Sequence, residues 1–321
     1  KYFGYYLLWS EWVLPIAQSL VSGSTPSRQR VEPAAFYNIQ VPVPPIEEQR
    51  SIGDLLRRVD AAISAQDTSI AVTHDLKRAA MRTLFTRGLR GEAQKETQSG
   101  VMPESWDVVP LGSLGRIGNG STPKKSILEY WEGGSYPWLA SAKVYDREIV
   151  SASQFVTETA LRECHLPQLE PGAILIAITG QGKTLGHCAV LAMRATINQH
   201  IAYVATDTAR ADPSFVRGYL ETQYEYLRQV GSGGGSTKGA LTCAFLRDMP
   251  VPLPSLEEQR EIVAILDALD RKIELHRRKR DVLNDLFKTL LHKLMTGEIR
   301  VTDLDLSTLE HQQAATAARG A

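Results

Sequence analysis

Two segments of the chain place apolar side chains at alternating steps of four and three residues. This is the heptad spacing of a helix in a coiled coil. Each pattern predicts a helix of about 40 residues, roughly 60 Å long at 1.5 Å per residue, which exceeds the core helix of a small domain. The apolar positions are Ile52, Leu56, Val59, Ile63, Ile70, Ala80 and Leu84 in residues 45–90, and Ile262, Leu266, Leu269, Ile273, Leu283, Phe287, Leu290 and Leu294 in residues 255–300.

The two heptad segments are copies of one another. Residues 41–86 align with residues 251–296 without a gap, 210 positions apart, and 16 of the 46 positions are identical. Each copy opens with prolines, which exclude a helix there, followed by an acidic pair suited to the positive end of a helix. A period this long excludes a solenoid, whose repeats are about 20–50 residues. The duplication indicates two large modules that each end in the same long helix.

The heptad pattern is interrupted by polar residues near its middle. Gln66 occupies a heptad position in the first copy, and His276 and Arg280 do so in the second. Polar core positions fix the register of a coiled coil at a cost in stability. The basic run 276–280 is interpreted as a solvated face, with contact to DNA phosphate or a partner subunit as the alternative. Two such helices on one chain predict an antiparallel coiled coil, although pairing between two chains is also compatible with the pattern.

Short apolar strands and Gly-rich turns characterise the region between the long helices. Strands are predicted at 172–179 and 200–206, and a helix near 213–230. The expected fold class is therefore α+β: an irregular, β-rich domain plus the two long helices. The expected organisation is 1–44, a first module's end; 45–90, the first helix; 91–101, a polar linker; 102–254, the β-rich domain; 255–300, the second helix; and 301–321, a disordered tail.

Composition restricts the class of protein further. The 321 residues carry 36 basic and 36 acidic side chains and are 43% hydrophobic, which is typical of a globular chain with room for two domains. No stretch approaches the roughly 18 apolar residues of a membrane span, and no signal peptide opens the sequence. Cys164, Cys188 and Cys243 are isolated and lack metal-ligand spacing. They predict reduced thiols and a cytoplasmic location.

The sequence contains no convincing catalytic or metal-binding motif. The run GQGKT at 180–184 resembles part of a P-loop, but the first glycine of that motif would fall at Ala177. His165, His187 and His200 show no metal spacing. Trp106, Trp131 and Trp138 are interpreted as core or hairpin anchors. The chain is expected not to be an enzyme.

Several segments together resemble the specificity (S) subunit of Type I restriction–modification systems. Their order combined with the duplication makes the resemblance specific. They are PESW (103–106), PLGSLGRIGNGSTPKK (110–125), YPWLASAKV (136–144), PGAILIAITGQGKTLGHCAV (171–190), INQHIAYV (197–204), GSGGGSTKGAL (231–241) and MPVPLPSLEEQREI (249–262).

The resemblance implies a non-catalytic subunit that recognises DNA. In this family, target-recognition domains are each followed by a long conserved helix, and together they direct adenine methylation and restriction to a bipartite site. Methylation would belong to M subunits, of which two are expected, with S-adenosylmethionine. Cleavage would belong to R subunits with ATP and Mg²⁺. The paired helices would be the M-subunit docking surface, and no membrane would be involved.

The first 44 residues resemble only the tail of a recognition domain. FGYYLLWSEW (3–12) parallels VRGYLETQYEY (216–226), and SGSTP (22–26) parallels GGSTK (234–238). Because Gly4 matches Gly218 and the first residue is Lys1, the sequence is expected to lack the body of a first recognition domain. Such a chain would read one half of a bipartite site.

Four polar clusters within 102–254 are candidate DNA contacts. Their hydroxyl, amide and lysine groups suit phosphate and base-edge hydrogen bonds, and glutamine can pair bidentately with adenine. The alternative for each is an ordinary solvated turn, because the domain as a whole is not strongly basic. Two other classes of protein are alternatives: a coiled-coil assembly scaffold without DNA binding, and a nucleotide-dependent enzyme. The candidate contacts are Ser121, Thr122, Lys124, Lys125; Gln181, Lys183, Thr184; Asn198, Gln199 (with His200); and Ser236, Thr237, Lys238.

Overall fold

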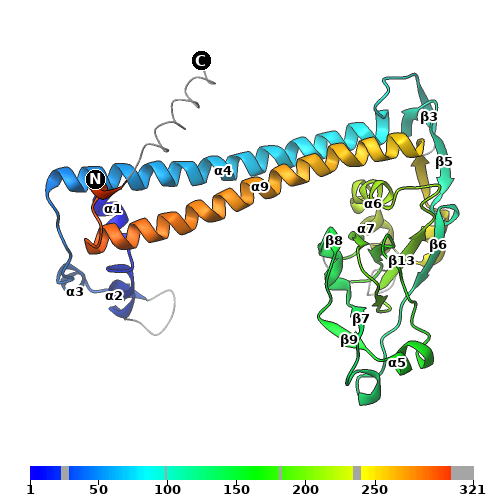
Figure 1. The fold of residues 1–321 in the computed structure, drawn as a ribbon, viewed down its shortest axis with the longest axis horizontal. Coiled ribbons are helices and arrows are strands. Elements are labelled where there is room, and N and C mark those ends of the chain that lie inside the picture. The colour runs from blue at the N-terminus through cyan, green and yellow to red at the C-terminus, as the bar shows by residue number, and fades with distance from the viewer. Residues whose placement is uncertain (23–28, 98–99, 181–182, 234–239, 305–321) are drawn as a thin grey trace. The chain divides into compact units, whose positions relative to one another are not determined.

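The computed structural model describes residues 1–22, 29–97, 100–180, 183–233 and 240–304 (Figure 1). Among the predicted features, the tail beyond residue 304 and the candidate contacts Gln181, Ser236, Thr237 and Lys238 lie outside these residues. The chain forms two compact units. One contains residues 1–74 and 271–321, and the other contains residues 75–270.

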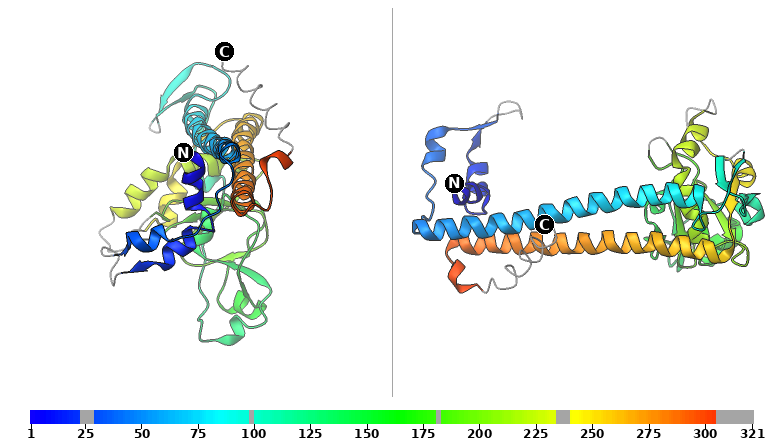
Figure 2. Two further views of the ribbon diagram at one scale, coloured as in Figure 1. Left: turned by 90° about the vertical axis from the view of Figure 1, so that its left-hand side faces the viewer. Right: turned by 90° about the horizontal axis from the view of Figure 1, so that it is seen from above.

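Two long helices are the most extended elements of the chain. Helix α4 spans Ile46–Arg87 and helix α9 spans Leu256–Thr296. In the unit of residues 1–74 and 271–321, the Gln66 amide oxygen lies 2.8 Å from Nδ1 of His276. In the unit of residues 75–270, Lys77 lies 2.9 Å from Asp270. Within the unit of residues 1–74 and 271–321, Ile52 and Leu56 share a cluster with Leu290 and Leu294, whereas Gln66 meets His276, so the pair is antiparallel there, as Figure 2 also shows. The predicted α+β class with an antiparallel helix pair is confirmed.

The shared glutamine of the duplicated segments anchors the start of each long helix. The Gln259 amide nitrogen donates to the carbonyl of Pro254 at 2.9 Å, and Gln49 makes the same bond to Pro44 at 2.8 Å. Each bond ties the first helical turn to the proline segment that precedes it. The acidic pairs stand in the first turns, where the helix dipole favours negative charge.

The unit of residues 75–270 is built on a five-stranded sheet. Its strand order is β6 (Gly115–Asn119), β13 (Ile201–Thr206), β10 (Ile174–Ala177), β11 (Cys188–Leu191) and β8 (Glu148–Ile149). All pairs are antiparallel except β11 with β8. A three-stranded sheet has the order β12 (Thr196–Ile197), β7 (Tyr136–Leu139), β9 (Gln154–Val156), and a further pair joins β14 (Pro250–Leu253) to β5 (Asp107–Pro110).

Short helices complete this unit. Helices α6 (Pro213–Thr222) and α7 (Tyr224–Ser232) occupy the predicted helical region, which is interrupted at Gln223. Asp212 caps the start of α6. Its carboxylate accepts hydrogen bonds from the backbone N–H groups of Ser214 and Phe215 at 2.8 and 3.1 Å. The other helices here are α5 (Glu158–Glu163) and α8 (Cys243–Asp248), with single turns at Leu111–Ser113, Leu128–Tyr130 and Ser141–Tyr145.

Residues 91–101 differ from the expected linker. They contain β3 (Gln94–Thr97) and enter β4 (Gly100–Pro103), which pair antiparallel as a hairpin. The Lys95 ammonium group donates to the carbonyls of Glu104 and Trp106 at 2.8 and 2.5 Å. The polar composition that suggested a linker is therefore that of a two-stranded element in which Gln94 and Glu96 are exposed and Met102 is buried.

Residues 1–45 form short elements in the other unit. They are α1 (Tyr2–Trp9), α2 (Leu14–Ser19), β1 (Val21–Ser22), β2 (Arg30–Val31) and α3 (Pro33–Tyr37). Phe3, Tyr6 and Leu7 of α1 join a buried cluster with the start of α4 and the end of α9. The division between the units falls within α4 and α9 rather than at the helix boundaries expected from sequence.

A buried carboxylate organises the core of the unit of residues 75–270. Glu258, 4% exposed, accepts hydrogen bonds from the Leu89 backbone N–H at 2.9 Å and from Nε1 of Trp106 at 3.2 Å. Trp106 is itself fully buried and meets Phe215 edge to face, with ring centroids 6.4 Å apart. One side chain from α9 thus fixes both the end of α4 and the entry to the β-rich region.

A network of ionic side chains joins the helix pair to the β-rich region of the same unit. Lys77 of α4 lies 2.9 Å from Asp270 and 3.8 Å from Glu221, and Arg147 contacts both Asp270 and Asp267. Arg217, with a side chain only 4% exposed, pairs with Glu221 at 2.7 Å. Burial lowers the pKa of Lys77 and of Arg147.

The ion network predicts an acid-dependent loss of stability. Burial acts to raise the pKa of Glu221, but Arg217 and Lys77 outweigh it and hold that pKa below the usual value of 4.5. A carboxyl group with a lowered folded-state pKa stabilises the protein above its unfolded-state pKa, and this contribution disappears as the pH falls through the folded-state value. The free energy of unfolding is measured at pH 7 and below pH 4.5. Its decrease on acidification should be smaller for Glu221→Gln than for wild type. An equal loss in both would contradict this role, and the exposed Glu225→Gln serves as control.

All three cysteines are free, as the isolated positions predict. Burial raises the pKa of Cys188 to about 12, so its thiol stays protonated at neutral pH. Within the described residues, no helix is both long and apolar enough to cross a membrane.

Candidate nucleic-acid interface

One end of the five-stranded sheet collects three polar turns from distant parts of the sequence. Asn119, where β6 ends, pairs with Ala202 near the start of β13, and Ala177, where β10 ends, pairs with Ile201. Because these neighbours are antiparallel, the turns after β6, after β10 and before β13 must emerge at the same edge. We call the described residues of these turns, 119–125, 178–180, 183–187 and 198–200, the polar sheet end.

Hydrogen bonds connect the three turns directly. The Thr122 hydroxyl donates to the Gln199 amide oxygen. The Gln199 amide nitrogen lies 3.2 Å from Nε2 of His200, and Nδ1 of His200 lies 2.6 Å from the Thr179 hydroxyl. A continuous chain of side chains therefore crosses from β6 through β13 to β10.

The turn after β6 exposes its two lysines. Lys124 and Lys125 are exposed, whereas Ser121 and Thr122 are half-buried. The backbone is held by Trp138, whose Nε1 donates to the Ser121 carbonyl at 3.2 Å, and by Trp131, whose Nε1 donates to that of Lys124 at 3.3 Å. The two tryptophan rings meet edge to face with centroids 5.3 Å apart. They act as anchors for this turn.

Asn198 lies beneath the polar sheet end. Its side chain is 5% exposed, and its amide oxygen accepts from the backbone N–H of His200 at 3.0 Å. Its own backbone N–H donates to the carbonyl of Leu139 at 3.0 Å. Asn198 therefore shapes the turn from the inside, whereas the side chain of the neighbouring Gln199 is exposed.

Aromatic residues hold the turn that carries Lys183 and Thr184. The Tyr145 hydroxyl lies 2.9 Å from the Thr184 hydroxyl, and the Tyr224 hydroxyl donates to the Lys183 carbonyl at 2.6 Å. His187 stands between the two tyrosine rings, with centroid distances of 4.7 and 4.5 Å. Burial lowers the pKa of His187, so the ring is neutral at pH 7. Lys183 is exposed above this support.

Three residues that shape the polar sheet end were not predicted from the sequence. Thr179, Tyr145 and Tyr224 meet partners 21, 39 and 41 residues away along the chain. No local spacing signals such contacts, because the strand order brings them together. In contrast, the Gly-rich and amide-rich character of the turns themselves was visible in the sequence.

The predicted coiled-coil positions are buried or half-buried along α4 and α9. In the unit of residues 1–74 and 271–321, buried heptad residues share one cluster, and Ile63 and Phe287 pack against it half-buried. In the other unit, Ile262 and Leu266 join the main core. Leu269 and Leu283 are half-buried, and Ile273 is 3% exposed. The clustered buried heptad residues are Ile52, Leu56, Val59, Leu290 and Leu294.

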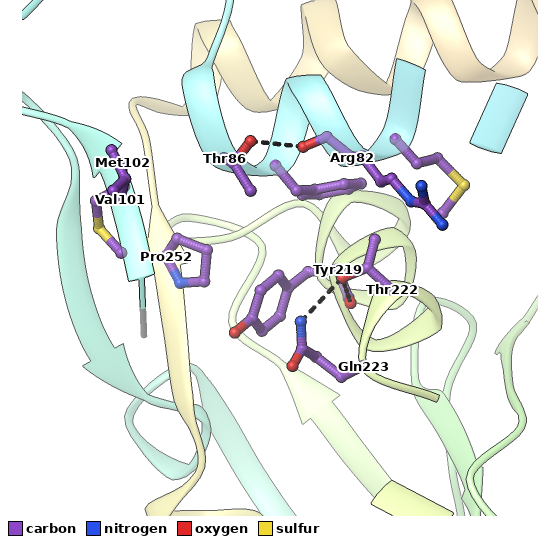
Figure 3. A pocket seen from close by; sticks show the side chains of 10 residues that line it. Arg82, Thr86, Val101, Met102, Tyr219, Thr222, Gln223 and Pro252 are labelled. Atoms are coloured by element: carbon purple, nitrogen blue, oxygen red, sulfur yellow. Dashed lines mark hydrogen bonds between the residues drawn. The ribbon is translucent and has the colours of Figure 1, made fainter. Parts of the chain in front are cut away.

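A separate cavity of about 210 Å³ lies beside the C-terminal turns of α4 (Figure 3). Arg82 and Thr86 line it on one side, and Tyr219, Thr222 and Gln223 line it on another. The Thr86 hydroxyl donates to the carbonyl of Arg82, and the Gln223 amide donates to the Thr222 hydroxyl. The lining of the cavity has one charged side chain and no histidine or carboxylate, so the cavity offers no acid–base pair. Within the described residues, no group of three His, Cys, Asp or Glu side chains is placed to hold a metal ion.

The architecture defines a β-rich domain that is entered and left through an antiparallel helix pair. Residues 103–285 match the family model described as the Type I restriction modification DNA specificity domain, and the chain belongs to this family.

Curated relatives are specificity subunits. A putative type I restriction enzyme MjaX specificity subunit of Methanocaldococcus jannaschii is 28% identical over 281 residues, covering 86% of this chain and 63% of the relative. The MjaIX specificity subunit of the same organism is 31% identical over 214 residues, covering 64% of this chain and 48% of the relative. The chain thus spans less than two thirds of the length of these relatives.

Solved structures share the fold. The HsdS subunit from Thermoanaerobacter tengcongensis superimposes with a TM-score of 0.56 at 23% identity, covering 92% of this chain and 70% of that one. The S subunit of the type I system from M. genitalium gives a TM-score of 0.58 at 20% identity, covering 91% and 72%. At these identities the similarity concerns the fold.

Proposed function

We propose that this chain is a non-catalytic DNA-recognition subunit whose polar sheet end contacts double-stranded DNA. The observation that carries the proposal is the convergence of three polar turns on one sheet edge, two of them with exposed lysines. Lys124, Lys125 and Lys183 provide cations for phosphate, while hydroxyl and amide groups between them suit base edges. Family membership supports DNA as the ligand.

The chemical steps would belong to partner proteins. Two methyltransferase (M) subunits with S-adenosylmethionine would methylate adenine, and restriction (R) subunits with ATP and Mg²⁺ would cleave DNA. The helix pair would be the M-subunit docking surface, because the duplicated segments present two near-copies of one sequence. The chain would thereby direct both activities to its target.

Co-expression with a cognate M subunit tests the complete proposal. Methylome sequencing of the host should reveal an adenine-methylation motif that disappears when this chain is omitted. A stable complex without new methylation would contradict the directing role. A chain that binds neither the M subunit nor DNA would be excluded as a specificity subunit, and an assembly scaffold would account better for its helix pair.

Neutralising Lys124 and Lys125 together should weaken DNA binding in a salt-dependent manner. Each lysine that contacts a phosphate releases about one counterion, so the Gln double variant should lower the slope of log K against log salt by about 2. Titration of duplex DNA at several salt concentrations measures that slope. The matched variant Lys272→Gln/Lys288→Gln removes two exposed charges from α9 and should leave the slope unchanged. Equal effects of the two variants would indicate general charge rather than contact.

A further inference from the structure

Hydrogen bonds fix the orientation of the Gln199 amide at the polar sheet end. Gln199 is exposed, yet both ends of its amide have protein partners: the oxygen accepts from the Thr122 hydroxyl, and the nitrogen lies 3.2 Å from Nε2 of His200. A freely rotating surface glutamine would have to lose side-chain freedom to bind a ligand. Here the neighbours have already restricted it.

The proton positions along this chain follow from the donor inventory. An amide NH₂ can only donate, so Nε2 of His200 is the acceptor in its bond with Gln199. With Nε2 as acceptor, the imidazole proton lies on Nδ1, which donates to the Thr179 hydroxyl 2.6 Å away. The hydroxyls of Thr122 and Thr179 can each donate or accept, so both satisfy this arrangement of the Gln199 amide.

The fixed amide retains one acceptor site and one donor. An amide oxygen has two lone pairs and an amide nitrogen has two N–H groups. Thr122 uses one lone pair, and His200 uses one N–H. The remaining lone pair and N–H match the N6 amino group and the N7 acceptor that adenine presents in the major groove.

We propose that Gln199 reads one adenine of the DNA target by a bidentate major-groove contact, with Thr122, His200 and Thr179 as positioning residues. The assignment of adenine to Gln199 rests on the proposed DNA-recognition function. It adds which base one residue of that interface contacts. Asn198 supports the arrangement from below, because its buried amide oxygen holds the backbone N–H of His200. Lys124 and Lys125 belong to the same turn as Thr122, where phosphate contacts would set the register of the base contact.

Selection from a randomised duplex library tests the assignment. The full chain, alone and with its M subunit, is used to select DNA, and the base preference at each position of the enriched motif is measured. Gln199→Ala should reduce the preference for adenine at one position by about 10- to 100-fold, the range of one bidentate contact, and leave the other positions unchanged. Gln199→Glu has the same shape but only acceptor oxygens, so it should move the preference at that position toward cytosine, whose N4 amino group donates.

Matched variants separate base reading from general structure. Gln168→Glu makes the same change at an exposed glutamine outside the polar sheet end and should leave the motif unaltered. Thr179→Val removes the partner of His200 and should weaken the preference at the Gln199 position alone, whereas Thr179→Ser should restore it. A merely structural role would lower thermal stability or weaken all positions together.

The outcomes distinguish failure of the proposed DNA-recognition function from failure of the Gln199 assignment. If wild-type protein, alone and with its M subunit, enriches no motif, the DNA-recognition function fails and the assignment fails with it. If wild type enriches a motif that Gln199→Glu leaves unchanged, only the assignment is overturned. If Gln199→Ala abolishes binding altogether, the same-shaped Gln199→Glu decides: an adenine-to-cytosine shift at one position supports the assignment, and any other result overturns it.

Discussion

Replacing Trp106 by alanine is expected to destabilise the unit of residues 75–270 by about 3–5 kcal/mol, the usual cost of removing a buried aromatic side chain. Trp106 is fully buried, packs against Phe215 and donates to Glu258. Its loss leaves a cavity and also removes a donor from a carboxylate that is 4% exposed. A buried acceptor without its donor carries its own desolvation cost.

Hydrogen exchange measured by mass spectrometry tests the destabilisation by Trp106→Ala within residues 75–270. A loss of at least 3 kcal/mol should accelerate exchange in the buried strands β10 and β13 by roughly 100-fold. Trp106→Phe keeps most of the ring and loses the N–H, so it should fall between wild type and Trp106→Ala. The control Trp9→Ala removes a side chain that is 60% exposed and should leave β10 and β13 unaffected. Unchanged protection in Trp106→Ala would show that Glu258 and Trp106 do not organise this core.

Replacing Leu56 by aspartate is expected to disrupt the helix pairing in the unit of residues 1–74 and 271–321. Leu56 is fully buried among apolar heptad residues of α4 and α9. Leucine-to-alanine changes at such sites cost about 2–5 kcal/mol, and an isolated carboxylate adds the cost of burying a charge without a partner. Protection of the backbone amides of 46–74 and 271–296 should therefore fall to that of a loosely packed helix pair.

A matched substitution controls for helix propensity and charge. Val72→Asp places the same carboxylate on α4 at a side chain that is 61% exposed, and it should be nearly neutral. If the M subunit docks on the helix pair, Leu56→Asp should also abolish its co-purification, whereas Val72→Asp should not. Similar exchange in the two variants would contradict a heptad contact at Leu56.

The helices were the most predictable part of the fold. Their heptad spacing depends on residues three and four apart, and the gapless duplication confirmed that both copies obey the same spacing. The predicted ranges 45–90 and 255–300 exceed the observed helices by a few residues at their C-terminal ends. Gly88 and Gly297, with φ angles of 65° and 73°, end them in the left-handed conformation that glycine adopts readily.

The β-rich region was predictable only in class. Apolar runs located β10 and β13, yet the order β6–β13–β10–β11–β8 depends on pairing between strands that are up to about 90 residues apart. Local pattern does not encode such pairing. The segment predicted as a polar linker, 91–101, likewise contributes to the pairing of β3 with β4, and Lys95 donates to backbone carbonyls at Glu104 and Trp106.

The sequence by itself determined that this protein has two copies of a long heptad helix, an α+β region between them and the motifs of its family, because each of these depends on neighbours along the chain. The tertiary structure decided which polar residues work together. Asn198 and Gln199 are adjacent in sequence, but one is 5% exposed and the other is exposed beside Thr122. Successive residues of an extended chain face opposite ways, and only the antiparallel neighbours of β13 decide which of those faces meets the core and which meets solvent.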